Sequence, residues 1–559
     1  MSRSPRKAIV QALTKVWSTR RFIADRDLAG WLRLRNAPPQ TFSMVVAIYK
    51  VEDYLDDFVR SVLRQRGGLK QLEVIFVNDG SPDRSGEIAK AWAARRPDVF
   101  RYIEQENQGV AAARNAGLRI ATGDWVGFPD PDDFFSRNYL LEARIAAMRG
   151  GEKLLAIKPN LILFQEASHR FQDRHPLRYR FRKGRRTVPL AEMDRDIFNS
   201  ASHLFLRRSI IEASGALFDP NIKPTFEDGS FVNNVLLSVE DGAIRFAPAA
   251  HYFYRRRADN SSAINNAADD RRWFTDQIRL GYLGLINNAL SRWGYVPIYI
   301  QRIVLYEIMW RFRHVLNNAN RASFLEDSEV EEFKALLHEA FEHISCDTIN
   351  EFELAGCTEE YKVAILGHYK STTRDAQRVY VKDLDEVKSL VQLAHYDVPG
   401  YERDITVRVN GKVADKLFPS GRSADLLGDV FFRERRFWVR AEPADLIEIT
   451  TAGAEPTQIV ARGGTLTEPA SREALFTPRP GPTGIAALRH RMRRIKARGF
   501  GLVRTALLGN RSLLQNPRRK LKLMAVRRYA QSDAARNLYG DCWLVMDRGD
   551  RADDNAEHL

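Results

Sequence analysis

The stretch LEVIFVNDGS, residues 72–81, shows most directly how this chain folds. Its first six residues form a short apolar run of the kind found in buried parallel strands. The four residues that follow are typical of a turn. In open α/β sheets, ligands bind beyond the carboxyl ends of the strands. Residues 78–81 are therefore a candidate binding loop, in which Asp79 can accept a hydrogen bond from a nucleobase or a ribose.

Strands and helices alternate on both sides of this stretch. We predict three further strands, at 44–49, 100–103 and 125–128. Helical spacing of apolar residues predicts helices at 54–66, 85–95 and 110–121. Strands that alternate with helices of this length indicate an α/β fold with a parallel sheet.

The fourth predicted strand leads into FPDPDD, residues 128–133. Three carboxylates, Asp130, Asp132 and Asp133, fall within four residues and repel one another unless a divalent cation neutralises them. Oxygen ligands suit Mg²⁺ or Mn²⁺, which bind through one or two carboxylates together with substrate phosphates. Taken alone, the same turn is also compatible with a solvated loop.

The rest of the chain has two other patterns. Residues 269–393 have long helical periodicity, whereas 401–461 contain short strands and an Asn410-Gly411 pair typical of a hairpin turn. A linker at 478–482 precedes a basic tract, residues 489–528, with fourteen Lys/Arg and no acidic residue. This tract interleaves leucines with its charges, which favours a helix on an anionic membrane surface. Packing on a neighbouring domain is an alternative, and nucleic-acid binding is disfavoured because interleaved aromatics are absent.

Composition excludes several classes of protein. Hydrophobic residues at 44% and charged residues at 28% are typical of a soluble globular chain. Three scattered cysteines, Cys346, Cys357 and Cys542, make a disulfide framework improbable and favour a reducing cytoplasm. No stretch approaches the roughly 18 apolar residues of a membrane-spanning helix. The net charge of +15 is concentrated in residues 1–40 and in the basic tract.

Six short motifs, in order, resemble the family 2 glycosyltransferases of GT-A fold. The resemblance spans roughly Ser43 to Ile264. One departure is Ala47, where the family usually has proline; this loosens the nucleotide-side loop but removes no functional group. The motifs are VVAIY at 45–49, VNDGS at 77–81, NQG at 107–109 with ARNAG at 113–117, DPDD at 130–133, FED at 226–228 and YRRR at 254–257.

The resemblance implies a pocket for a nucleotide sugar. By this resemblance, Asp79 binds a uracil-type base and Asp130 lies near the ribose or the donor sugar. Arg257 and Ser261 close over the diphosphate. The full set of implied pocket residues is Ala47, Tyr49, Asp79, Asn107, Arg114, Asp130, Arg257 and Ser261.

The resemblance also implies the catalytic groups. Asp132 ligates a Mn²⁺ or Mg²⁺ ion on the diphosphate, and Asp228 is the general base with Glu227 beside it. The cation and arginines stabilise charge on the leaving phosphate, while the base takes the proton of the acceptor hydroxyl. One direct displacement inverts the anomeric centre. Taken alone, the Glu-Asp pair is equally typical of a helix N-terminus.

Two further segments bear on the acceptor. Residues 170–186 contain eight Lys/Arg, and we predict an acceptor-side basic patch of Arg178, Arg180 and Arg182 for a phosphate-bearing acceptor. A solvated surface loop is the alternative. Residues 541–559 resemble the opening of the CDP-glycerol glycerophosphotransferase family, which builds polyol-phosphate polymers of teichoic-acid or capsule type. The chain is therefore expected to be the first part of a two-module protein, cut near the module boundary.

We therefore expect a GT-A domain that moves a hexose or N-acetylhexosamine from a UDP-sugar to a phosphate-containing cell-surface polymer. It would act in the cytoplasm at the inner face of the membrane. A nucleotidyltransferase of related fold, or a non-catalytic polymer- or nucleic-acid-binding protein, is the alternative. The other regions would hold the polymer or join protomers. The expected segments are a basic helical lead at 1–40, the GT-A domain at 41–268, a helical region at 269–396, a small β-sandwich-like module at 397–475, and a linker, basic helices and truncated second module at 476–559.

Overall fold

The computed structural model describes residues 40–476, apart from 67, 194–195, 259–265, 371–377, 403, 452–456, 462–463 and 467–468. The chain divides into two compact units, Met1–Leu475 and Phe476–Leu559, and the fold described below is that of the first. Several predictions lie outside the described residues: Ser261, the lead segment, the basic tract, and the segment at 541–559.

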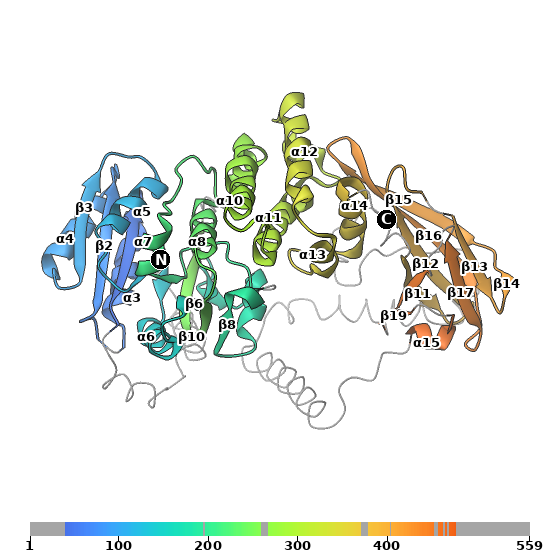
Figure 1. The fold of residues 1–559 in the computed structure, drawn as a ribbon, viewed down its shortest axis with the longest axis horizontal. Helices are drawn as coiled ribbons and strands as arrows, with labels where there is room; N and C mark the ends of the chain where they lie inside the picture. Colours follow the sequence, from blue (N-terminus) through green and yellow to red (C-terminus); the bar gives the residue numbers. More distant parts are fainter. Residues whose placement is uncertain are drawn as a thin grey trace, which may run out of the picture. The chain divides into compact units, whose positions relative to one another are not determined.

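The first half of the large sheet consists of parallel strands in the order β3-β2-β1-β4. Helices α3, α4 and α5 connect them (Figure 1). These elements confirm the alternation predicted from the sequence, with ends shifted by a few residues. Their bounds are β1 Phe42–Ile48, α3 Glu52–Leu63, β2 Leu72–Asp79, α4 Ser85–Arg95, β3 Phe100–Gln105, α5 Val110–Arg119 and β4 Trp125–Gly127.

Both faces of β1, β2 and β4 are buried, which explains their apolar runs, whereas the edge strand β3 is partly exposed. On β1, Val45 packs towards α5, while its neighbours Met44 and Val46 belong to the core under α3 and α4. Gly117 lets α5 approach β1 closely, because a Cβ atom there would meet Val45 Cγ1 at 2.3 Å. The glycine of the ARNAG motif therefore has a packing role.

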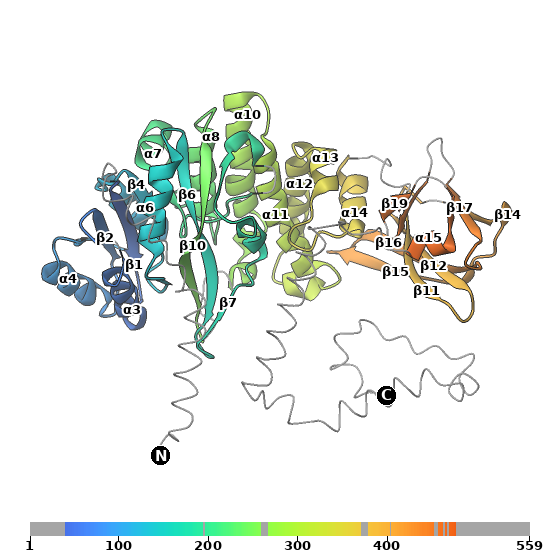
Figure 2. The same ribbon diagram turned by 90° about the horizontal axis from the view of Figure 1, so that it is seen from below.

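The second half of the sheet is mixed and was not predicted from the sequence. The two long strands β6 and β10 run parallel to each other, and the short strand β9 joins β6 to β4 by antiparallel pairing. Figure 2 shows β6 and β10 side by side. The elements of this half are β5 Phe134–Phe135, α6 Tyr139–Gly150, β6 Leu154–Gln165, β7 Arg170–Gln172, β8 Arg186–Pro189, β9 Phe205–Arg207, α7 Arg208–Ser214, α8 Glu227–Leu237 and β10 Ala243–Arg256.

A helical region follows and shares its apolar core with α8. Trp293 donates a hydrogen bond from Nε1 to the carbonyl of Leu237 (3.0 Å), which ties α10 to the end of α8. None of the helices in the described ranges is both long and apolar enough to cross a bilayer. The principal helices are α10 Gly284–Trp293, α11 Ile298–Val315, α12 Asp327–Glu342, α13 Cys346–Glu351 and α14 Glu359–Lys370.

The predicted helical stretch extends too far: residues 378–397 are strands. β11 (Arg378–Asp385) and β12 (Leu390–Asp397) pair with each other as an antiparallel hairpin. Their valines and tyrosines favour strands, and both are held by the sheet that forms later in the chain. The β module therefore includes residues 378–397.

The β module consists of two sheets, in agreement with a sandwich-like fold. One has the order β15-β16-β12-β11-β18-β19 and the other β14-β13-β17-β20. Asn410 and Gly411 both have positive φ values, +50° and +77°, as the predicted hairpin turn requires. The remaining elements are β13 Ile405–Val409, β14 Lys412–Val413, β15 Leu417–Leu426, β16 Asp429–Arg440, β17 Leu446–Thr451, β18 Gln458–Ala461, β19 Gly464–Leu466, β20 Ala470–Ser471 and α15 Arg472–Phe476.

Candidate active site

The predicted nucleotide-side residues lie at the carboxyl ends of β1, β2 and β3. Ala47 is half-buried near the end of β1, and the Tyr49 side chain beyond it is exposed. Asp79 ends β2, and Asn107 is exposed in the loop after β3. Since these parallel strands end at one edge of the sheet, the topology gathers all four residues there.

Asp79 is buried and holds the loop that carries Asn107. Its carboxylate accepts hydrogen bonds from the backbone N–H groups of Gln108 (3.0 Å) and Gly109 (2.8 Å) and from the side-chain amide of Gln105 (2.8 Å). Gly109 has a φ of +89° and precedes α5. Asp79 therefore fixes the start of α5, a role that its position in a turn motif did not predict.

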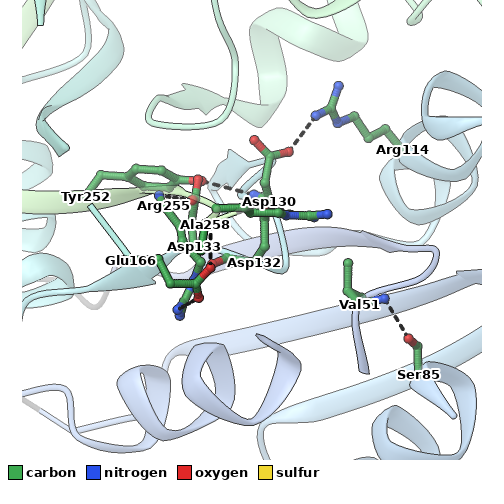
Figure 3. Close-up of polar contacts among 11 residues, drawn as sticks. Val51, Ser85, Arg114, Asp130, Asp132, Asp133, Glu166, Tyr252, Arg255 and Ala258 are labelled. Carbon is green, nitrogen blue, oxygen red and sulfur yellow. Dashed lines mark hydrogen bonds and ion pairs between the residues drawn. The ribbon is translucent and has the colours of Figure 1, made fainter. Parts of the chain in front are cut away.

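Arg114 links the two groups of predicted catalytic residues. It lies buried on α5 and donates from Nη2 to Asp130 Oδ1 (2.9 Å) and from Nη1 to Glu227 Oε1 (2.8 Å). Its guanidinium also lies 5.4 Å from the ring centre of Phe218. Figure 3 shows the Asp130 carboxylate turned towards Arg114. The structure thus brings together residues more than one hundred positions apart in the sequence.

The carboxylates around Arg114 outnumber its single charge. Burial raises the pKa of Asp130 to about 6 in spite of Arg114, and the charges of Asp132 and Asp228 add to this rise. Burial and the neighbouring charge of Asp228 raise the pKa of Glu227 to about 7. The site therefore carries excess negative charge near neutral pH, when these groups ionise.

Arg257 and Arg255, at the end of β10, hold the aspartate loop from its other side. Asp132 Oδ2 accepts hydrogen bonds from Nε (2.9 Å) and Nη2 (2.8 Å) of Arg257. The Arg255 backbone N–H donates to Asp133 Oδ1 (2.7 Å), and its Nε donates to the carbonyl of Asp132 (2.7 Å). The Asp130 N–H donates to the Tyr252 hydroxyl at 3.1 Å (Figure 3). The three aspartates are thus fixed by residues of one strand.

The Glu227-Asp228 pair begins α8. The Asp228 carboxylate accepts hydrogen bonds from the backbone N–H groups of Ala201 (3.1 Å) and Gly229 (2.7 Å). Phe226, just before the pair, has a left-handed backbone with a φ of +81° and is buried. Non-glycine residues with this conformation cluster at functional sites, where the surrounding fold enforces them. The sharp entry into α8 places both carboxylates beside Arg114.

The aspartate loop is chemically suited to a hard divalent cation. Burial and the charges of Asp132 and Asp130 raise the pKa of Asp133 well above its usual range, as expected where carboxylates crowd without a counter-ion. No three His, Cys, Asp or Glu side chains of the described residues converge into a cage that encloses a metal ion. Mg²⁺ and Mn²⁺ do not need such a cage, because one or two carboxylates and a diphosphate complete their coordination.

A buried cluster of basic residues near Asp228 was not predicted from the sequence. It consists of Lys158, Arg180 and His203, all at most 2% exposed. Among the described residues, Lys158 Nζ and both ring nitrogens of His203 have no hydrogen-bond partner. Burial and the other positive charges lower the pKa of Lys158 and that of His203, whereas the charge of Asp228 opposes this for Lys158. The sequence signal that could have revealed this cluster was Lys158, a lysine inside the apolar run LLAIKPNLIL.

The three arginines predicted as one basic patch are separated by their environments. Arg178 and Arg182 are exposed, in and just after the 3₁₀ helix η1 (Pro176–Phe181). Arg180 is buried, and its guanidinium donates to the backbone carbonyls of Leu177 and Ile197. Helical geometry turns Arg180 inward, so it does not belong to an exposed patch.

Parts of the chain are similar to known proteins. Residues 43–215 match the family model described as Glycosyl transferase family 2. The minor teichoic acid biosynthesis protein GgaB of Bacillus subtilis (strain 168) is 28% identical over 310 residues, which cover 56% of this chain and 33% of GgaB. GgaA of the same organism is 29% identical over 299 residues, which cover 51% of this chain and 65% of GgaA. The chain thus spans one third to two thirds of these relatives.

Among solved structures, S. aureus TarS residues 1–349 match with 16% identity and a TM-score of 0.43, over 59% of this chain and 87% of that one. The family match covers the predicted motifs from VVAIY to DPDD, and the α/β sheet places them at one edge. Residues 43–215 of this chain are a family 2 glycosyltransferase domain.

Proposed function

We propose that this chain is an inverting, divalent-cation-dependent enzyme that transfers a hexose or N-acetylhexosamine from a UDP-sugar to a hydroxyl group of a phosphate-containing cell-surface polymer. One observation carries the proposal. Arg114 lies within the residues that match the family 2 model, and it joins the aspartate loop to the Glu227-Asp228 pair, beyond that match, through two ion pairs. A leaving-group site and a base thereby lie on either side of one buried guanidinium.

On the donor side, we assign the nucleotide to the edge formed by Asp79, Asn107 and Tyr49. Asp130 faces the ribose or the sugar, and Asp132 is the carboxylate ligand of a Mn²⁺ or Mg²⁺ ion. When bound, the ion supplies Lewis-acid stabilisation of the departing diphosphate. Arg257, paired with Asp132 in the described structure, would offer N–H donors to the same phosphates.

On the acceptor side, we assign Asp228 as the general base. Its two backbone hydrogen bonds hold the carboxylate in one orientation, which a proton acceptor for a sugar or polyol hydroxyl requires. Glu227 positions Arg114, so it acts through the guanidinium and does not need to touch the acceptor. Displacement from the face opposite the diphosphate inverts the anomeric carbon without a covalent intermediate.

Two observations favour an acceptor that carries phosphate. The buried basic residues Lys158 and His203 have nitrogens without a hydrogen-bond partner in the described part of the chain, and Lys158 is close enough to Asp228 to feel its charge. An anionic group would compensate this costly burial. Moreover, the printed names of GgaB and GgaA describe minor teichoic acid biosynthesis. We extend this substrate class to the present chain as part of the proposal.

The experiment is transfer of sugar from a panel of UDP-, GDP-, CDP- and dTDP-sugars to an oligo(glycerol phosphate), with product linkage determined by NMR. The proposal expects one UDP-sugar to be used, with inverted configuration in the product. A retained configuration would contradict the single displacement. Transfer only to a neutral oligosaccharide would contradict the acceptor class.

We further propose that the enzyme works in the cytoplasm against the inner membrane face. The support is the basic tract 489–528, whose Lys/Arg and leucines suit an anionic lipid surface. Flotation with vesicles containing anionic lipid tests this. Binding that disappears with neutral vesicles or with a chain shortened at residue 488 agrees with the proposal, and undiminished binding by the shortened chain contradicts it.

A further inference from the structure

A second candidate binding site lies in the β module. A cavity of about 560 Å³ opens beside the edge strand β15 and its neighbour β16. Five basic side chains but only two acidic ones line it. Its charged lining residues are Lys416, Arg422, Arg433, Arg435, Arg436, Asp404 and Glu434.

Two buried carboxylates hold three of these arginines. Glu434, fully buried on β16, accepts hydrogen bonds from Arg422 Nε and from Arg436 Nη2 (2.8 Å). Asp397, equally buried on β12, accepts one from Arg435 Nε (2.8 Å). Burial alone would raise the pKa of Glu434, but its bonds to Arg436 and Arg422 outweigh burial and lower it. Both carboxylates thus act as fixed anchors below the surface.

The guanidinium groups themselves remain accessible. Their side chains are 57% (Arg422), 54% (Arg435) and 38% (Arg436) exposed. Each uses one nitrogen for its carboxylate in the described structure, although a guanidinium has five N–H donors. The donors that remain are held in place at the rim of a cavity, and such preorganised arginines suit phosphate oxygens.

The lining also discriminates between polyanions. Phe437, beneath Lys416, and His395 are the two residues with aromatic rings among the lining residues described, and each is 4% exposed. Single-stranded nucleic acids rely on exposed aromatic rings on which bases stack. Gly421 and Ser423 on β15 instead leave room for a narrow chain between the cations. The lining itself therefore offers cations for a phosphate chain but no exposed ring on which a base could stack.

We propose that this cavity is a non-catalytic binding site for a phosphodiester polymer, held by Arg433, Arg435 and Lys416 with Arg422 and Arg436 at the rim. The site is separate from the catalytic one. Only the choice of polymer as its ligand rests on the proposed function. Such a site would keep a growing polymer on the enzyme between transfers and raise its effective concentration at the active site.

The test measures binding of an oligo(glycerol phosphate) to the full chain by calorimetry. The first variant is Arg433→Gln with Lys416→Gln, because the partners of these residues, Glu402 and Asp404, are exposed and no buried carboxylate loses its cation. The second is Ser423→Glu, which adds a negative charge and removes no ion pair. We expect Kd to rise by at least about tenfold in each, because a single lost charge-assisted contact is worth about that much and the first variant removes two cations.

The matched control is Lys412→Gln with Arg440→Gln, which removes one lysine and one arginine from exposed positions outside the cavity. It should retain the wild-type Kd. Equal weakening in control and cavity variants, no binding by the wild type, or tighter binding of single-stranded DNA through the same residues would overturn the proposal. Every measurement is repeated on Asp228→Asn: binding that persists while transfer fails separates this site from the proposed function.

Discussion

The catalytic domain and the β module each contain an ion pair between an arginine and an aspartate. The arginine is the more buried partner in the catalytic domain, and the aspartate is the more buried partner in the β module. In the catalytic domain the Arg114 side chain is 7% exposed and its partner Asp130 is 33% exposed. In the β module Asp397 is fully buried and its partner Arg435 is 54% exposed. In each pair the more buried member positions the less buried one, which is the member that a ligand can reach. Under the proposals above, the first region takes a nucleotide sugar with a divalent cation at Asp132, and the second takes phosphate groups directly.

The largest effect on activity is expected when the proposed general base, Asp228, is replaced. Asp228→Asn keeps the shape of the side chain but cannot take a proton, so the transfer rate should fall by about 10³-fold. Donor binding, measured by calorimetry, should stay within about twofold, because Asp228 lies outside the donor contacts. Asp98→Asn, an exposed carboxylate outside the site, serves as control. If Asp228→Asn kept the wild-type transfer rate, Asp228 would not be the general base.

Replacing Arg114 and replacing Glu434 should lower the free energy of unfolding by different amounts. Arg114→Gln leaves Asp130 and Glu227 without a cation, so the free energy of unfolding should fall by about 3–5 kcal/mol. Glu434→Gln leaves exposed arginines that water can solvate, and should cost about 1 kcal/mol. Chemical denaturation of both variants measures the difference. Equal losses would break the comparison.

Glu227 should make the stability of the catalytic domain depend on pH. Burial raises its pKa from 4.5 to about 7, so the folded chain keeps a proton that the unfolded chain releases between these values. The stability due to this group is present below about pH 4.5 and is lost as the pH rises through about 7. Glutamine cannot ionise, so Glu227→Gln should gain up to about 3 kcal/mol relative to wild type between pH 5 and pH 8.

Denaturation curves at the two pH values measure this gain, with the exposed Glu240→Gln as control. A difference between Glu227→Gln and wild type that does not change with pH would show that Glu227 is ionised throughout. The β module offers no counterpart, since the arginines lower the pKa of Glu434.

The smallest effect is expected for acceptor length. If the β module holds the polymer, Arg433→Gln with Lys416→Gln should raise KM for a long oligo(glycerol phosphate) by about tenfold and leave KM for a short one unchanged. The value of kcat should not change, because these residues lie outside the catalytic domain. Steady-state kinetics with the two acceptors decides, and an equal rise for both lengths would argue against a separate polymer site.

Much of the fold could be predicted from local pattern. The strands β1 to β4 and helices α3 to α5 were predicted because short apolar runs alternate with helical spacing. The mixed half was not predicted, since β9 has only three residues and the apolar run of the long strand β6 is interrupted by Lys158 and Pro159. Residues 378–397 were included in the predicted helical stretch, although their valines and tyrosines favour strands, and pairing with β16 and β18 fixes them as strands.

Some residues of the candidate site could likewise be predicted from local sequence motifs, and others could not. Asp79, Arg114, Asp132 and Asp228 stand in short motifs and could be predicted. The contacts of Tyr252 and Lys158 depend on how distant strands meet, which no local motif records. Arg180 belonged to a basic run, but its inward position follows from the turn that carries it.

The most direct test of the central claim is nucleotide release from a UDP-sugar with Mn²⁺, with EDTA, and by Asp132→Ala. Asp132 is 18% exposed and paired with Arg257, so alanine removes a carboxylate at the surface of the site without stranding a buried charge. The account predicts slow release of UDP with Mn²⁺ that falls by about 10³-fold with EDTA and in the variant. Release that is unaffected by both, or that no sugar nucleotide supports, would contradict it.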